Sequence, residues 1–298
     1  MNPIKAWIWA MRPKTLTGAM VPVVMGCALA IRDGVAQWRP ALLCLLFAGL
    51  MQMAANLIND LYDFLKGTDR EDRLGPERAC AQGWITPHAM KWGIGVTLAL
   101  AALTGLGVVA VCYRTLPWHG AELVLLGALC MLFAFLYTTY LSYRGWGDLL
   151  VLLFFGLVPV GGTYYVQAAT VTPEVVCASL VSGLCIDALL VVNNYRDREQ
   201  DRVSGKRTLV VRWGEQVGSY LYLGVGIAAW LLCVAMVPMG VLTVDELVWA
   251  PTAYLLLHFM TWRRMVAIGK GKELNRILGE TSRNMALMGL LWSLAVAL

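Results

Sequence analysis

Residues 40–63 read PALLCLLFAGLMQMAANLINDLYD, an apolar run that ends in a cluster of Asn and Asp side chains. The apolar part, 40–58, approaches the ~20 residues that a helix needs to cross the hydrocarbon core of a bilayer. The whole chain is 59% hydrophobic and 14% charged, whereas soluble domains are about 45–50% apolar and about 25% charged. The sequence therefore predicts an integral membrane protein.

Apolar runs of this kind recur along the chain with no linker or low-complexity stretch between them. Nine are recognisable, at 17–31, 40–58, 92–113, 123–141, 149–169, 175–192, 216–242, 247–262 and 284–298. Only helices and closed barrels satisfy the backbone in lipid, and these runs are too long and continuous for barrel strands. We therefore expect an all-α fold with nine transmembrane helices in one bundle, forming a single domain over residues 1–298.

The basic residues distinguish the two sides of the membrane. With the N-terminus inside, 21 of the 24 Lys and Arg residues fall in the inner segments, which are 1–16, 66–91, 142–148, 195–215 and 263–283. The outer segments keep only Arg32, Arg39 and Arg114. The positive-inside rule predicts this asymmetry and places the polar end of 40–63 in the cytoplasm. The net charge of +5 thus reflects topology rather than nucleic-acid binding.

The Asn/Asp cluster recurs where the run 175–192 ends, and when the two clusters are aligned, Asn59 and Asp63 match Asn193 and Asp197. Residues three or four apart share one face of a helix. The first cluster therefore forms a stripe of Asn56, Asn59, Asp60 and Asp63, and the second a stripe of Asn194, Asp197 and Asp201. This repetition suggests that the two helices face each other across a cavity.

Carboxylates beside a bilayer are costly unless something compensates them. Mg²⁺ prefers oxygen ligands and is usually held by one or two carboxylates together with phosphate oxygens of a substrate. Two facing stripes could therefore hold Mg²⁺ ions with a diphosphate between them. Basic residues follow both clusters, among them Lys66, Arg78, Lys206 and Arg207, and they would neutralise the remaining phosphate oxygens.

Two alternatives stay open on the residues alone. Acids within a membrane often mark ion pathways, so an ion transporter is the alternative from another functional class. Asp187 lies two turns deeper than the second stripe, on nearly the same helix face, where it either lines the cavity or pairs with an inner Arg.

The sequence resembles the UbiA superfamily of intramembrane aromatic prenyltransferases over nearly its whole length. Within this superfamily, three segments resemble the branch that acts on 1,4-dihydroxy-2-naphthoate: Arg12-Pro13-Lys14-Thr15-Leu16, Gly162-Thr163-Tyr164-Tyr165-Val166-Gln167 and Gly205-Lys206-Arg207-Thr208. The two Asp motifs, Gly75-Pro76-x-Arg78 and Gly145-x-Gly147-Asp148 complete the resemblance. The chain departs from the branch at 137–143, which is shorter than usual, so another aromatic acceptor such as 4-hydroxybenzoate is the alternative.

The resemblance implies nine helices around a central cavity with cytoplasmic cap loops, in the bacterial cytoplasmic membrane. It implies transfer of a polyprenyl group from polyprenyl diphosphate to 1,4-dihydroxy-2-naphthoate, with loss of CO₂ and pyrophosphate, giving demethylmenaquinol for menaquinone biosynthesis. Carried over by motif, the Mg²⁺ ligands are Asn59, Asp63, Asp197 and Asp201. Asp60, Asp69 and Asn194 would support this site. Asp60 and Asn194 are the candidate catalytic residues, with Asp60 as a base or orienting group for the acceptor. The diphosphate contacts are Lys66, Arg78, Lys206 and Arg207.

Overall fold

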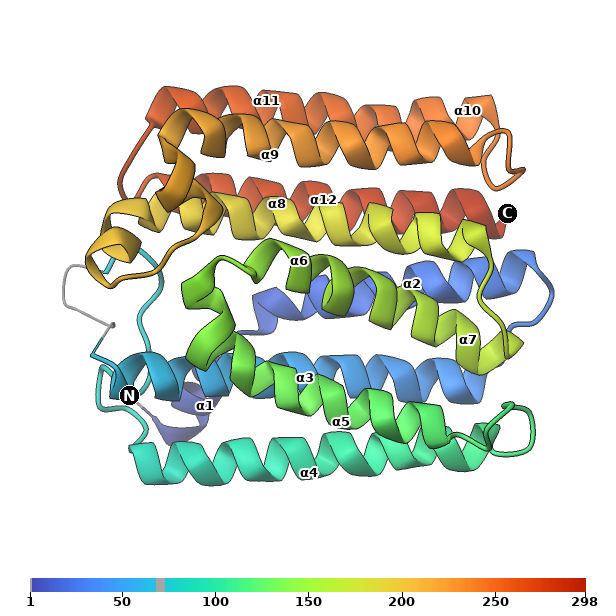
Figure 1. Cartoon of the computed structure of the whole chain (residues 1–298), viewed down its shortest axis with the longest axis horizontal. Coiled ribbons are helices and arrows are strands. Elements are labelled where there is room, and N and C mark those ends of the chain that lie inside the picture. Colours follow the sequence, from blue (N-terminus) through green and yellow to red (C-terminus); the bar gives the residue numbers. More distant parts are fainter. Residues whose placement is uncertain (1, 68–72) are drawn as a thin grey trace.

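The computed structural model describes residues 2–67 and 73–298, and all regular structure in these ranges is helical. The helices lie side by side along one direction (Figure 1). In chain order they are α1 (Pro3–Met11), η1 (Pro13–Thr15), α2 (Leu16–Arg32), α3 (Trp38–Leu65), α4 (Pro87–Cys112), α5 (Ala121–Leu136), η2 (Tyr137–Leu141), η3 (Ser142–Arg144), α6 (Gly147–Val151), η4 (Leu152–Gly161), α7 (Gly162–Ala168), α8 (Pro173–Val203), α9 (Leu209–Met236), α10 (Val244–Leu247), η5 (Val248–Thr252), α11 (Ala253–Ile268) and α12 (Leu274–Ala297).

Seven helical segments of the described chain are long and apolar enough to cross a membrane. They are Pro3–Arg32, Trp38–Leu65, Pro87–Cys112, Ala121–Arg144, Gly147–Ala168, Pro173–Val203 and Leu209–Met236. These segments correspond to the first seven predicted runs. The last two predicted runs, 247–262 and 284–298, fall in the helices from α10 to α11 and in α12, which are not among the seven.

The two helices that carry the Asn/Asp motifs end at the same end of the bundle (Figure 1). α3 continues through its motif to Leu65, and Gly67, with φ +67, follows directly after the helix. α8 begins at Pro173, where the Thr172 side chain caps the helix by accepting a hydrogen bond from the Val175 N–H, and continues to Val203. The N-terminus lies at this end and the C-terminus at the other.

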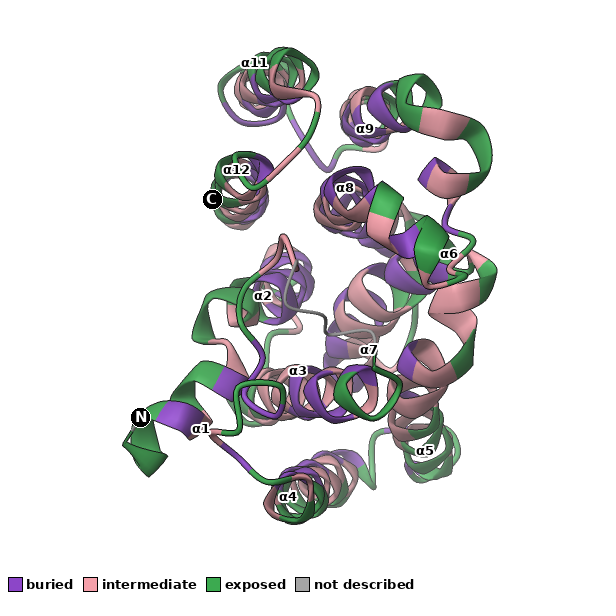
Figure 2. Cartoon of the chain, turned by 90° about the vertical axis from the view of Figure 1, so that its left-hand side faces the viewer, coloured by how far each residue is buried: buried purple, intermediate pink, exposed green. Residues whose placement is uncertain are grey.

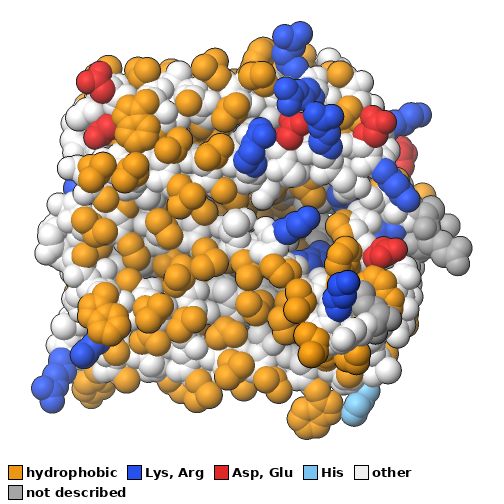
Figure 3. Space-filling view, turned by 180° about the vertical axis from the view of Figure 1, so that it is seen from behind, with side chains coloured by type: hydrophobic (Ala, Val, Ile, Leu, Met, Phe, Trp, Pro, Cys, Tyr) orange, Lys and Arg blue, Asp and Glu red, His pale blue; other side chains and the backbone are white. Residues whose placement is uncertain are grey.

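The core is formed around α8, which packs against α9, η4, α12 and α2. Seen from the polar end, α4 and α5 lie beyond α3 on one side, and α9 and α11 lie beyond α8 and α12 on the other (Figure 2). Large hydrophobic side chains also cover the outside of the bundle (Figure 3). The aromatic rings of Trp38, Trp92 and Trp118 are among the most exposed, as expected for residues at a membrane interface.

Candidate active site

A cavity of about 1900 Å³ lies within the bundle, with walls from α2, α3, α5, η4, α8 and α12. Its apolar walls include Phe47, Phe133 and Phe154, and its polar residues include members of both Asn/Asp stripes. From behind, the molecule shows a hollow bordered by Lys and Arg side chains, with hydrophobic side chains over much of the remaining surface (Figure 3). The cavity thus joins an apolar chamber to a charged end.

The first stripe reaches this cavity through Asn59 and Asp63, which lie one helical turn apart on α3. Asp63 is buried and accepts a hydrogen bond from Arg78 Nη2 at 3.0 Å. Asn59 accepts a hydrogen bond from the Thr138 hydroxyl through Oδ1. A predicted metal ligand and a predicted diphosphate contact, Asp63 and Arg78, therefore lie in direct contact.

Asp60 has a different environment from the rest of its stripe. It is buried and does not line the cavity. Its Oδ2 accepts a hydrogen bond from the Ala79 N–H, and its Oδ1 accepts one from the Cys80 N–H, both at 2.9 Å. Both oxygens of Asp60 therefore hold the loop that presents Arg78, which is a supporting position rather than one that faces a substrate.

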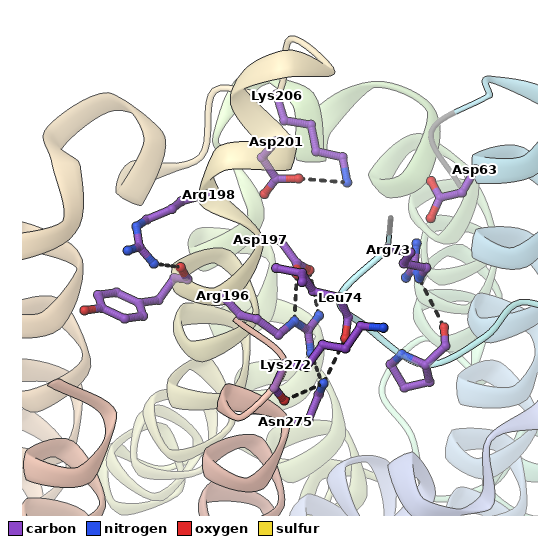
Figure 4. A network of polar contacts seen from close by, with 12 residues as sticks. Asp63, Arg73, Leu74, Arg196, Asp197, Arg198, Asp201, Lys206, Lys272 and Asn275 are labelled. Atoms are coloured by element: carbon purple, nitrogen blue, oxygen red, sulfur yellow. Dashed lines mark hydrogen bonds and ion pairs between the residues drawn. The ribbon is translucent and has the colours of Figure 1, made fainter. Parts of the chain in front are cut away.

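The second stripe contributes Asn194, Asp197 and Asp201 to the cavity wall. Both oxygens of Asp197 accept hydrogen bonds from Arg196, at 2.7 and 2.6 Å. Arg196 also donates from Nη1 to Asn275 Oδ1 at 2.7 Å, and Asn275 Nδ2 donates to the backbone carbonyl of residue 74 at 2.8 Å (Figure 4). This network joins the loop after α3, the end of α8 and the start of α12.

Two lysines lie beside one aromatic ring at the mouth of the cavity. Lys66 Nζ lies 4.0 Å and Lys206 Nζ 5.4 Å from the centre of the Tyr143 ring. Lys206 Nζ lies 3.6 Å from an oxygen of Asp201, while Lys66 donates to the Thr139 carbonyl at 2.7 Å. Figure 4 shows Lys206 extending from the side of Asp201 toward the side of Asp63.

The two lysines differ in proton affinity. Loss of hydration lowers the pKa of Lys66 below its ordinary 10.5, and nearby Lys206 adds to this effect against the opposing effect of Asp63. Burial also tends to lower the pKa of Lys206, but the negative charges of Asp201 and Asp63 outweigh it and leave that pKa raised. Lys206 therefore retains its positive charge to higher pH than Lys66.

Arg207, a predicted diphosphate contact, is not brought to the cavity. Its side chain is exposed and does not belong to the lining. Its backbone N–H donates to the Tyr143 carbonyl at 2.9 Å. Its carbonyl oxygen would lie 2.5 Å from a Cβ atom on Gly145, where φ is +82, so this close approach requires glycine. The backbone of Arg207 thus positions the loop that carries Tyr143.

Two basic residues of the cavity, Arg12 and Lys272, have no assigned role in the sequence prediction. Arg73, one of the basic residues that follow the first motif, also lies in the lining. Arg12 has a left-handed backbone with φ 52, and its Nη2 is buried with no hydrogen-bond partner within residues 2–67 and 73–298. The motif Arg12-Pro13-Lys14 was the available signal for Arg12, whereas Lys272 belongs to no recognised motif. Asp69, predicted to support the metal site, lies outside the described residues.

Asp187 neither lines the cavity nor forms an ion pair with an Arg among the described residues, which were the two roles predicted for it. Its side chain is buried, and it does not itself belong to the cavity lining. One of its carboxylate oxygens has no hydrogen-bond partner among the described residues. The ion pairs described at this end of the bundle use Asp63, Asp197 and Asp201 instead.

The acids of the two stripes fit Mg²⁺ that is shared with a phosphorylated substrate. Within 2–67 and 73–298, no group of three or more His, Cys, Asp or Glu side chains could hold a metal ion by itself. The four predicted ligands nevertheless offer oxygen donors, and Mg²⁺ commonly takes one or two carboxylates and completes its shell with water and phosphate oxygens. The donor chemistry therefore suits a metal–diphosphate complex better than a bare ion.

Solved structures share this fold across almost the whole chain. A UbiA homolog from Archaeoglobus fulgidus bound to GPP and Mg²⁺ superposes with a TM-score of 0.70, at 15% identity, over 98% of this chain and 99% of that one. A structure described as digeranylgeranylglyceryl phosphate synthase superposes with a TM-score of 0.65, at 18% identity, over 100% of this chain and 99% of that one.

Curated sequences are more closely similar. The 1,4-dihydroxy-2-naphthoate octaprenyltransferase of Escherichia coli is 41% identical over 235 residues, which cover 78% of this chain and 76% of the relative. The enzyme of the same name from Mycobacterium tuberculosis is 36% identical over 301 residues, covering 100% of this chain and 97% of the relative. Residues 19–288 match the UbiA prenyltransferase family, and the chain therefore belongs to that family.

Proposed function

We propose that this protein transfers a polyprenyl group from polyprenyl diphosphate to 1,4-dihydroxy-2-naphthoate, releasing pyrophosphate and CO₂ and giving demethylmenaquinol. The observation that carries the proposal is the pair of Asn/Asp stripes, with their Lys and Arg partners, at the charged end of one large apolar cavity. The acceptor follows from the relatives that are 36–41% identical to this chain and are named for that naphthoate.

The diphosphate would lie between the two stripes. Asn59, Asp63, Asp197 and Asp201 would hold Mg²⁺, which when bound neutralises the diphosphate and makes it a better leaving group. The lining residues Lys66, Arg78 and Lys206 would contact the remaining phosphate oxygens. Asp63, Asp197 and Asp201 are paired with bases in the structure, so in binding Mg²⁺ and diphosphate these groups would exchange one charged partner for another.

The prenyl chain would extend into the apolar part of the cavity. Its apolar and aromatic walls would exclude water and so protect an allylic cation from hydrolysis once the bond to diphosphate has broken. Asn194 lies in the lining and stays our candidate for a residue that contacts the reacting groups. Arg12, whose buried Nη2 has no partner in the part of the chain that the structure describes, would bind the carboxylate of the acceptor.

We further propose that the chain crosses the membrane nine times, with α10–α11 and α12 as the last two crossings. These helices run alongside the seven apolar segments, and the chain termini lie at opposite ends of the bundle (Figure 1). The excess of Lys and Arg in the predicted inner segments supports a cytoplasmic N-terminus and a cytoplasmic active site.

The test is a reconstitution of the purified full chain with Mg²⁺, a prenyl diphosphate and a panel of aromatic acids, followed by mass detection of product and CO₂. We expect the prenylated naphthoquinol, and no product after chelation of Mg²⁺. Turnover of 4-hydroxybenzoate in place of the naphthoate would overturn the acceptor assignment. Ion flux in proteoliposomes without prenyl transfer would overturn the enzyme assignment.

A further inference from the structure

Two acidic residues near the active site remain without a role in the proposed function. Asp148 lies at the start of α6 and lines the cavity, and Asp187 lies on α8 with 3% of its surface exposed. One oxygen of each carboxylate is buried and has no hydrogen-bond partner among the described residues. Buried polar groups are rarely left without a partner. Because Asp148 lines the cavity, its unpartnered oxygen points to a ligand that binds there.

The two acids belong to one polar patch. α6, which carries Asp148, packs against α8, which carries Asp187. The charge of Asp148 acts on Asp187, and Tyr137 feels both of these carboxylates as well as Asp63 and Asp201. Tyr137 lines the cavity, and its hydroxyl lies 3.8 Å from the position that a Cβ on Gly147 would occupy, next to Asp148. We call these three side chains the Tyr137–Asp148–Asp187 patch.

The patch is suited to hold one proton. Two neighbouring carboxylates repel each other when both are charged, and burial strengthens the repulsion. Such a pair favours a state that shares one proton and titrates as a unit. In this state it can accept a hydrogen bond and exchange a proton with a ligand. A phenolic hydroxyl is the ligand class that both donates a hydrogen bond and can lose a proton.

We propose that Asp148 binds a ring hydroxyl of the aromatic acceptor and takes its proton during prenyl transfer. This inference rests on the proposed function, whose acceptor carries two ring hydroxyls. Asp148 would be a catalytic residue, because it reaches the cavity. Asp187 would be a positioning residue that shares the proton, with Tyr137 bordering the same hydroxyl.

The step balances without an added reactant. The ring carbon that bears the carboxylate forms a bond to the first prenyl carbon, whose bond to diphosphate breaks and leaves its electron pair on the diphosphate. The neighbouring O–H bond breaks, its proton moves to Asp148, and its electrons form a ring carbonyl. When CO₂ departs, its bonding electrons form a ring double bond, the carbonyl electrons return to the ring oxygen, and Asp148 returns the proton to that oxygen.

The test compares Asp148→Asn and Asp187→Asn with the unaltered full chain in detergent. We expect kcat to fall by about 10²-fold or more in each variant, the usual effect of a positioned proton acceptor, with the KM for prenyl diphosphate unchanged. We also expect the melting temperature to hold or rise, because each change removes one of two neighbouring acids that cannot both be charged at low cost. A purely structural role would instead lower the melting temperature.

Ser182→Ala is the matched control on α8, since its buried hydroxyl donates to the Phe155 carbonyl at 3.0 Å and does not line the cavity. We expect its kcat within about twofold of the unaltered chain. Near-normal kcat in both Asn variants would overturn the inference, as would losses that follow a lowered melting temperature. Failure of the proposed function would look different, because the unaltered chain would then not prenylate the naphthoate.

Discussion

At the residue scale, three carboxylates of the two stripes, those of Asp63, Asp197 and Asp201, are already paired with neighbouring bases. Asp63 contacts Arg78 at 3.0 Å, and Asp197 contacts Arg196 at 2.6 Å. Leaving a buried carboxylate without a partner would be strongly destabilising, so these pairs stabilise the site when no substrate is bound. A metal–diphosphate complex carries both signs of charge. Its Mg²⁺ would replace the base beside each carboxylate, and its diphosphate would replace the carboxylate beside each base.

The first prediction concerns the carboxylates themselves. Asp63→Ala and Asp197→Ala should each lower kcat by about 10²-fold or more, because charge that develops on the leaving diphosphate would lose its metal ligand. The measurement is turnover with saturating Mg²⁺, prenyl diphosphate and naphthoate. Glu280→Ala is the control, since that carboxylate pairs with Arg264 and Arg276 and does not line the cavity. Near-normal turnover in either Asp variant would contradict the metal assignment.

A second prediction follows from the lowered pKa of Lys66. A lysine is positively charged below its pKa, so a lowered pKa means that the charge is lost at lower pH than usual as the solution becomes alkaline. The kcat/KM for prenyl diphosphate, which reports the free enzyme, should therefore fall on the alkaline side. Lys66→Arg should move this fall to higher pH, because a guanidinium stays charged.

Lys206→Arg is the comparison for this experiment, since the raised pKa of Lys206 already keeps that residue charged into alkaline solution. Its alkaline fall should stay where the unaltered chain has it. An unchanged profile in Lys66→Arg would show that another group controls the fall.

Spacing along the chain predicts which residues of one helix share a face, but it does not predict which loops or helices pack against that face. Asp60 follows the same spacing as Asp63, yet its partners are backbone N–H groups of Ala79 and Cys80 in the following loop. For the same reason the motifs do not predict Asn275, which lies far from them in sequence and accepts a hydrogen bond from Arg196. These contacts depend on the paths of the loops, which the periodic spacing of residues in the sequence does not predict.

At the element scale, the apolar runs predict where helices lie better than where they end. The run 40–58 is part of α3, Trp38–Leu65, and the run 175–192 is part of α8, Pro173–Val203. Both helices continue through their polar motifs because the side chains there find partners in loops and neighbouring helices. The short helix α1 was not predicted; it buries Ala6 and Ala10 beside α3.

The contact between η4 and α8 supports a third prediction. A Cβ on Gly156 would clash with the Ser179 carbonyl oxygen and would lie 3.2 Å from Gly183 Cα. Small residues allow such close helix packing in membranes. Gly156→Ala should therefore destabilise the protein by about 1–3 kcal/mol, the usual cost of overpacking, which a melting curve in detergent would measure.

Gly224→Ala is the control for this packing experiment, because a Cβ on Gly224 of α9 would meet nothing within 4 Å. Its effect should be neutral or stabilising by up to about 1 kcal/mol, since alanine favours helix more than glycine does. Equal melting temperatures for the two variants would contradict the importance of the η4–α8 contact.

At the scale of the whole molecule, the site depends on elements that are distant in sequence. Asn275 of α12 bonds both Arg196 of α8 and the Leu74 carbonyl after α3, so three parts of the chain meet at the charged end. The sequence predicts the two stripes and also predicts that they lie at the same end of the bundle. Both predictions follow from local patterns, namely helical spacing and the distribution of Lys and Arg. The cavity itself follows from packing among helices, which local patterns do not determine.

The fourth prediction tests the orientation of the bundle in the membrane. Gln82 lies in the loop between α3 and α4, and Thr115 lies between α4 and α5, and both are exposed. A membrane-impermeant thiol reagent should label Thr115→Cys in intact cells, but Gln82→Cys only after permeabilisation. The eight native cysteines are buried or half-buried, so the unaltered chain supplies the background. The reverse labelling pattern would place the charged end of the cavity outside the cell, and both substrates would then have to be supplied from that side.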